Sequence, residues 1–313
     1  MGKQNRSMER RQRRYKEIAE ARAIPYSEAD RWWSTDTLAV VTGSNRGIGF
    51  EIVQQLAKHG LAVVLTSRDS DKGQEVVASL QKQGLNVVFH QLDIVDTNSV
   101  NQFAKWVEEN FGGIDILVNN AGANFNTGSS NSVEHAQTVI YTNYYGSKRM
   151  IESMLPLMRS SASGARILNV GSRLGRINGR RNKIGDELLR NQLEDEEHLT
   201  EELIDNTVER FLEQVKEGTW ISGGWPQNFT DYSVSKLAVN SYTRLLSRRL
   251  SDRPAGSKIY ANCYCPGWVK TDMTGGEGIA TADEGADTGV WTVLLPPESP
   301  TGKFFAERRE IRY

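Results

Sequence analysis

Short runs of apolar, β-branched residues alternate with helix-length amphipathic stretches from Thr37 onward, and this alternation restricts the fold more than any other feature. The apolar runs are TLAVVTG, LAVVLTS, NVVFHQLD, IDILVNNAG, ARILNVGS, KIYANCYCPG and GKFFAE. Apolar strands that alternate with helices predict a parallel sheet covered on both faces. We therefore expect a doubly wound (Rossmann) α/β domain that binds ligands at the carboxyl ends of its strands.

Two segments depart from this alternation. Residues 1–36 begin with a basic, polar stretch, which we expect to be a solvated, partly helical tail up to about Lys16. The later stretch IPYSEADRWW carries aromatic residues that can dock on the main domain, residues 37–313. From about 176 to 228, Leu and Ile at helical spacing predict an insertion of one or two amphipathic helices, with an acidic, solvated face.

Composition excludes several classes of protein. The 313 residues carry a formal net charge of -1, which gives no reason to expect a nucleic-acid or membrane partner. No apolar run reaches the roughly 20 residues that a membrane span needs. Cys263 and Cys265 fall on one face of a predicted strand and make a poor disulfide pair, as in a reducing compartment. We expect a cytoplasmic protein without a bound metal, although the basic start leaves organellar targeting open.

A glycine-rich turn connects the first predicted strand to the first helix. Gly43, Gly47 and Gly49 give the spacing G-x-x-x-G-x-G. Glycines at this point let the backbone turn tightly and approach a phosphate, which the amino end of the helix attracts. The turn predicts a dinucleotide site, and an ordinary tight turn is the alternative.

The end of the second strand indicates which dinucleotide binds. Ser67 and Arg68 stand there, and Arg46 lies in the glycine turn. Two guanidinium groups suit the 2′-phosphate of NADPH, whereas NAD folds usually place an acidic residue at this strand end. NADPH is therefore favoured over NAD, but Asp69 would restore an acidic ribose ligand if the strand ended one or two residues later.

Tyr232 and Lys236 are four positions apart at the start of a predicted helix, so their side chains share one face. An isolated Tyr-x-x-x-Lys is common by chance. Here it follows, in order, TGSNRGIG, NNAG, Asn143 and Ser172 in NVGS, and precedes PGWVKTDM. From about Thr37 the chain resembles the short-chain dehydrogenase/reductase family. The insertion and CYCPGWVKTDM resemble its carbonyl reductase branch, which includes the plant menthone, neomenthol and salutaridine reductases.

The resemblance implies a catalytic role for four residues. Tyr232 would be the general acid in carbonyl reduction, and the Lys236 ammonium would lower its pKa and bind the nicotinamide ribose. Ser172 would hydrogen-bond the substrate oxygen. Asn143 would hold a water that connects Lys236 to solvent.

The resemblance also assigns residues to the cofactor. Asp93 would contact the adenine, with a turn or N-cap role as the alternative and Asp96 as the better N-cap. The complete set of expected contacts is Gly43, Asn45, Arg46, Gly47, Ile48, Gly49, Ser67, Arg68, Asp93, Ile94, Asn119, Ala121, Gly122, Tyr232, Lys236, Pro266, Gly267, Val269 and Thr271.

Aromatic residues surround the predicted catalytic tyrosine. Trp225 and Phe229 precede it, and Trp268 follows the sixth strand. They suggest a pocket for a lipophilic aldehyde or ketone, and packing beneath the insertion is the alternative. The sequence thus predicts an NADPH-dependent carbonyl reductase.

Three other functions are weaker alternatives. They are a non-catalytic NADPH sensor, a nucleotide-sugar epimerase, and nucleic-acid binding by the tail. Many members of the resembled family pair through the helix that carries the tyrosine. In carbonyl-reductase-like members the insertion covers this helix, so the resemblance implies a monomer.

Overall fold

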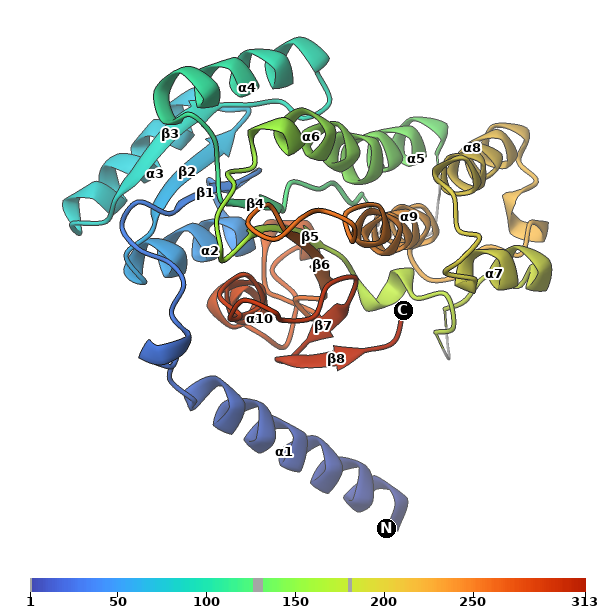
Figure 1. Ribbon diagram of the computed structural model, residues 1–313. Helices are drawn as coiled ribbons and strands as arrows, with labels where there is room; N and C mark the ends of the chain where they lie inside the picture. The colour runs from blue at the N-terminus through green and yellow to red at the C-terminus, as the bar shows by residue number, and fades with distance from the viewer. Residues whose placement is uncertain (1, 126–131, 180–181) are drawn as a thin grey trace.

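The computed structural model describes residues 2–125, 132–179 and 182–313, and it shows one twisted sheet between two layers of helices (Figure 1). The strands are β1 (Leu38–Val41), β2 (Ala62–Ser67), β3 (Val87–Gln91), β4 (Ile116–Asn119), β5 (Ala165–Val170), β6 (Ile259–Tyr264), β7 (Phe304–Ala306) and β8 (Arg309–Ile311). They lie in the order β3-β2-β1-β4-β5-β6-β7-β8, and all neighbours are parallel except β7 and β8. The predicted doubly wound α/β fold is confirmed.

Helices cover both faces of the sheet because its central strands are apolar on both sides. In β1, Leu38 and Val40 belong to one buried cluster while Ala39 and Val41 belong to the other. One face is covered by α2 (Gly47–Lys58), α3 (Ser70–Lys82) and α10 (Ala282–Val293). The other face is covered by α4 (Thr97–Phe111), α5 (Val133–Ile140), α6 (Ser147–Met154) and α9 (Thr230–Arg249).

Short helical turns complete the connections between these elements. They are η1 (Glu28–Asp30), η3 (Leu155–Leu157), η4 (Arg173–Gly175), η5 (Trp220–Ser222), η6 (Asp272–Thr274) and the π-helical turn η2 (Tyr141–Gly146), which joins α5 to α6.

The predicted insertion forms two helices, α7 (Glu187–Glu194) and α8 (Glu201–Glu217). Phe211 on α8 is fully buried against the rest of the core. The acidic face is not entirely solvated as expected, because Glu201 and Asp205 both form ion pairs with Lys148. These pairs fix α8 to α6, and α8 also packs on α9.

The strand β8 was not predicted. It pairs antiparallel with β7 across a two-residue turn, Glu307 and Arg308, whose φ angles are 57° and 53°. Such turns favour Gly and Asn, because their residues take up left-handed conformations at little cost. Glu-Arg at these positions therefore gave no sign of a hairpin.

The segment around Tyr26 and Trp33 docks on the main domain. Trp33 is buried against Tyr26 and His59, and its Nε1 donates to the carbonyl oxygen of His59 at 3.1 Å. The aromatic docking predicted for this segment is therefore confirmed. A single helix, α1 (Gly2–Ala23), precedes it and continues well beyond Lys16. No helix of the described residues is long and apolar enough to span a membrane.

Candidate active site

The first turns of α9 bring Tyr232 and Lys236 to the carboxyl end of β5. Lys236 is 5% exposed, and its Nζ donates to the carbonyl oxygen of Val170 at 2.7 Å. The same nitrogen lies 5.5 Å from the centroid of the Tyr232 ring. The two residues therefore face the sheet edge at which α/β folds bind their ligands.

Ser172 stands beside Tyr232, two residues after β5 ends. Its Oγ accepts a hydrogen bond from the backbone N–H of Leu174 at 3.1 Å, so Ser172 is the N-cap of η4. Ser172 also forms a hydrogen bond with Tyr232. A Cβ at Gly175 would stand 2.3 Å from the backbone of Lys236. Only glycine at 175 lets η4 pack directly on α9, and this packing brings the serine and tyrosine together.

Asn240 is a residue of the site that the sequence reasoning missed. Its Nδ2 donates to the carbonyl oxygens of Ser172 at 3.2 Å and Gly175 at 3.0 Å. Asn240 follows Lys236 by one helical turn, so the face of α9 that carries Tyr232 and Lys236 also holds the serine turn. The four-residue spacing was the available signal.

Burial dominates the pKa values of the pair. It raises the pKa of Tyr232 well above 10; nearby Cys265 raises it further, and the hydrogen bond with Ser172 lowers it. The net shift is therefore upward instead of the lowering that we expected, because desolvation of the phenolate outweighs the attraction of nearby positive charge. Burial lowers the pKa of Lys236 from 10.5 to about 8. Tyr232 is therefore a protonated phenol at neutral pH, as a proton donor must be.

Asn143 lies in the π-helical turn η2, a distortion that often marks functional sites. Its Nδ2 donates to the carbonyl oxygen of Ala123 at 3.0 Å and to Oγ of Ser235 at 2.9 Å, while its Oδ1 accepts the N–H of Ala123 at 2.7 Å. Both amide hydrogens are therefore occupied. A water held by this side chain would have to donate to Oδ1.

The glycine turn precedes α2 as predicted, and neighbouring residues shape it. Gly43 and Gly47 both have φ of 59°, and a Cβ at Gly49 would stand 2.3 Å from Nδ2 of Asn120. That nitrogen donates to the carbonyl oxygens of Thr42 and Gly43, both at 2.9 Å. Asn120 thus fixes the turn from β4. The sequence reasoning noted NNAG but assigned no role to its second asparagine.

Both arginines that were expected to bind the 2′-phosphate are exposed. Arg68 lies at the end of β2, and Arg46 forms an ion pair with Asp272 at 2.7 Å. Ser67 donates to the carbonyl oxygen of Asp69 at 2.6 Å. Asp69 is the N-cap of α3, so its carboxylate is occupied by the helix.

Three of the other expected contacts have structural duties. Oδ1 of Asp93 accepts the N–H of Val95, which supports the turn-forming alternative, and Asp96 is the N-cap of α4 as predicted. Ile94 is buried. Asn119 is buried, and its Nδ2 donates to Oδ1 of Asn169. Because these side chains are buried or already hydrogen-bonded, the three residues would contact a cofactor mainly through their backbone atoms.

The segment after β6 lies against the glycine turn. Cγ2 of Thr271 lies 3.4 Å from where a Cβ on Gly47 would stand, and Val269 is buried against Gly285 of α10. Pro266 is half-buried and Gly267 exposed, with φ of 92°. Ile48 is half-buried and Asn45 lies in the turn itself, whereas Ala121 and Gly122 follow β4. These residues surround one region at the strand ends.

Trp225 was wrongly assigned to the substrate. It is 1% exposed, its ring packs against Phe211, and its Nε1 donates to Oε1 of Gln214 at 2.7 Å. It therefore belongs to the core beneath the insertion. Phe229 and Trp268 are exposed at 47% and 54%, so both can contact a ligand.

A dinucleotide fits the residues at this edge. A Cβ at Gly43 would stand 2.8 Å from the backbone of Ala121, so the turn keeps its backbone open to a phosphate only as glycine. The amino end of α2 adds N–H groups, and Arg46 and Arg68 add exposed positive charge. The neighbouring Lys236 can donate to a ribose hydroxyl.

Comparison with known proteins gives a consistent set of relatives. A family model described as short chain dehydrogenase matches residues 37–183. The chain is 40% identical to (+)-neomenthol dehydrogenase of Arabidopsis thaliana, over 88% of this chain and 97% of that protein. It is 38% identical to carbonyl reductase 1 of Bos taurus, whose name specifies NADPH, over 90% of this chain and 99% of that protein.

A solved structure shows the same likeness. Salutaridine reductase from Papaver somniferum superposes with a TM-score of 0.78 at 37% identity, covering 86% of this chain and 99% of that one. The likeness in sequence and in fold therefore extends over most of the chain.

Proposed function

The chain belongs to the short-chain dehydrogenase family, and on that premise we propose that it reduces an apolar aldehyde or ketone to the alcohol with NADPH. The hydrogen bond between Ser172 and Tyr232, beside the buried Lys236, is the observation that carries this proposal. It joins a proton donor and an oxygen-binding hydroxyl at the strand end where a cofactor binds.

Each side chain has a separate task in the reaction. NADPH, when bound, supplies the hydride that the carbonyl carbon accepts. Ser172 donates a hydrogen bond to the carbonyl oxygen, where negative charge develops, and Tyr232 gives that oxygen its proton. The Lys236 ammonium favours the phenolate that Tyr232 leaves behind. Asn143 ties the loop after β4 to α9 and so keeps these groups in register.

NADPH is the cofactor that the charges and the relatives support. Arg68 is exposed at the end of β2, and Asp69, the residue that could have bound a ribose hydroxyl, caps α3 instead. The name of the bovine relative specifies NADPH. An arginine pairs with a 2′-phosphate through parallel, charge-assisted hydrogen bonds that NAD cannot form.

An exposed apolar rim supports a lipophilic substrate. Trp268 and Ile279 are both exposed, and the N–H of Ile279 donates to the carbonyl oxygen of Trp268 at 2.9 Å. Exposed Met273 lies near Gly122, and exposed Phe229 immediately precedes α9. Clustered apolar side chains near a polar site are typical of pockets for apolar small molecules.

The test measures the oxidation of NADPH through the loss of its absorbance, with a panel of aldehydes, cyclic ketones and quinones as substrates. The same assay with NADH runs in parallel. Turnover that is faster with NADPH would support the reductase. Tight NADPH binding without turnover on any compound would favour the non-catalytic sensor. The intact set of Asn143, Ser172, Tyr232 and Lys236 makes the reductase the stronger candidate.

The pH dependence of the reduction rate should show the loss of the proton from Lys236. Its pKa is lowered by burial to about 8, so the ammonium is lost as pH rises through that value. We expect kcat/KM for carbonyl reduction to fall above about pH 8, because neutral Lys236 no longer favours the phenolate. A rate that stays level from about pH 7 to pH 10 would contradict this role.

The lowered pKa of Lys236 also makes the stability of the fold depend on pH. Between about pH 8 and 10.5 the unfolded chain keeps a proton on Lys236 that the folded chain has released. This group therefore makes the free energy of unfolding rise with pH across that window.

We also propose that the protein is a monomer. Residues 233–247 of α9 are all buried, and α5 and α8 pack on this helix. No free face of this segment is left to pair with a second copy. We expect size-exclusion chromatography with light scattering to give the 35.0 kDa of one chain, and a mass of twice that value would refute the proposal.

A further inference from the structure

The helix α1 lies outside the part of the chain that the family model matches, and it runs beside β8 and α10 (Figure 1). Arg14 holds the carboxylate of Glu307 in two places, Nε to Oε2 at 3.0 Å and Nη2 to Oε1 at 2.8 Å. The same Oε1 accepts Nη1 of Arg173 at 3.2 Å. Because Arg173 directly follows Ser172, one carboxylate links the amino-terminal helix to the serine turn.

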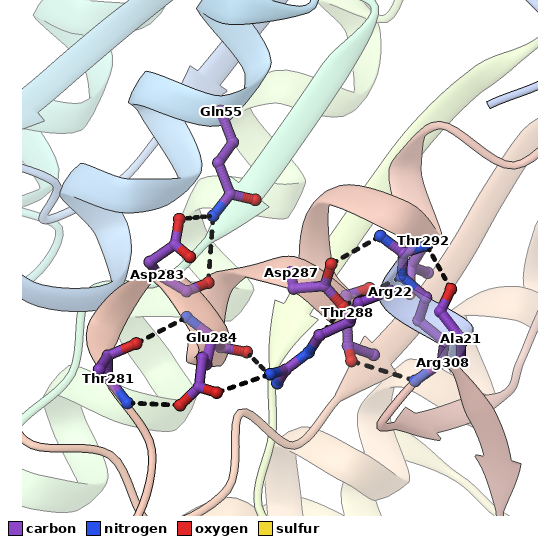
Figure 2. A network of polar contacts seen from close by, with 10 residues as sticks. All are labelled: Ala21, Arg22, Gln55, Thr281, Asp283, Glu284, Asp287, Thr288, Thr292 and Arg308. Carbon is purple, nitrogen blue, oxygen red and sulfur yellow. Dashed lines mark hydrogen bonds and ion pairs between the residues drawn. The ribbon is translucent and has the colours of Figure 1, made fainter. Parts of the chain in front are cut away.

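Arg308, the second residue of the turn that carries Glu307, also contacts α1. Arg308 forms a paired contact with Asp287 of α10, at 3.0 and 2.6 Å, and its Nη1 donates to the carbonyl oxygen of Ala21 at 3.0 Å (Figure 2). Both turn residues have left-handed φ angles without being glycine, a conformation that persists only where its surroundings impose it. Contacts from α1 and α10 supply that restraint.

A third contact attaches α1 to the amino-terminal end of α10. Nη1 of Arg22 contacts Oε1 of Glu284 at 3.0 Å, and its Nη2 donates to the carbonyl oxygen of Glu284 at 2.8 Å. Glu284 also closes the capping box of α10 with Thr281, as Figure 2 shows. Two positions of α1 are therefore attached to the main domain, Arg14 through Glu307 and Arg22 through Glu284.

We propose that α1 is a positioning element of the active site, which acts through Arg14 and Glu307 on Arg173 and so keeps the Ser172 turn in place. Burial raises the pKa of Glu307, but Arg14 and Arg173 lower it more, so the carboxylate stays charged at neutral pH. The kinetic readout rests on the proposed reduction, in which Ser172 binds the carbonyl oxygen.

The test compares Arg14→Ala with Lys16→Ala in the full chain. Lys16 loses the same charge from the same helix, but its ion pair is with Glu20 of α1 itself. For Arg14→Ala we expect kcat for the carbonyl to fall about two- to fivefold, the effect of losing an ion pair at the surface, with an unchanged KM for NADPH. Arg14→Lys should recover part of the loss, because lysine restores the charge without the paired geometry.

Two further measurements separate positioning from general stability. Amide hydrogen exchange of residues 173–175 should be faster in Arg14→Ala and unchanged in Lys16→Ala. In a Glu307→Gln background, Arg14→Ala should cause little additional loss, because the link is already broken. Equal effects of Arg14→Ala and Lys16→Ala, or unaltered exchange, would overturn the proposal. The exchange result stands even if no carbonyl is reduced, which would refute the proposed function instead.

Discussion

Replacing Tyr232 by Phe is expected to lower kcat/KM for carbonyl reduction by about 10² to 10⁴, the usual contribution of a positioned general acid. The substitution removes one oxygen and leaves the ring in place against Lys236. The burial-raised pKa keeps the phenol protonated at neutral pH, so the wild-type chain always has this proton to give. NADPH affinity should change little, which fluorescence titration of the bound cofactor can measure together with the rate.

Tyr264→Phe is the matched control for this substitution. Tyr264 is fully buried in β6, and within the described residues its hydroxyl has no hydrogen-bond partner. Its removal should leave both rate and stability near those of the wild type. If Tyr232→Phe and Tyr264→Phe retained similar activity, the proton donor would have to be another group.

The periodic part of the fold could be predicted because its information is local. Apolar runs such as 38–41 in β1 and 116–118 in β4 must be buried on both faces, and the glycines at 43 and 47 form the tight turn that their spacing predicted, each with φ of 59°. Tyr232 and Lys236 share a face simply because a helical turn separates them. These features need no knowledge of distant contacts.

The features that escaped prediction depend on contacts between different elements of the fold. Arg14 meets Glu307 across 293 positions, and no local pattern indicates such a pair. Trp225 was assigned to a substrate pocket because it is one of the aromatic residues near Tyr232 in the sequence, but Phe211 of the inserted α8 packs against it. In both cases a helix contacts a residue of a turn or loop, and the periodicity of the sequence does not report such contacts.

Ser172→Ala should be the second most damaging change, with a fall in kcat of about 10² to 10³, as for loss of a donor to a developing oxyanion. Ser172 also lowers the pKa of Tyr232 through their hydrogen bond, against the effect of burial. Without it the pKa of Tyr232 should rise further. Oxidation of the alcohol, which needs the phenolate as base, should then require higher pH than in the wild-type chain, and pH–rate profiles in both directions would measure this.

Ser241→Ala separates this role from the ordinary cost of removing a buried hydroxyl. Ser241 is completely buried on α9, and in the described part of the chain its Oγ has no hydrogen-bond partner. Its loss should not change the rate, and stability should stay equal or increase slightly. A Ser172→Ala variant that lost stability but kept its kcat would assign Ser172 to the structure of η4 alone. A variant that kept its stability and lost kcat would place its hydroxyl at the reacting oxygen.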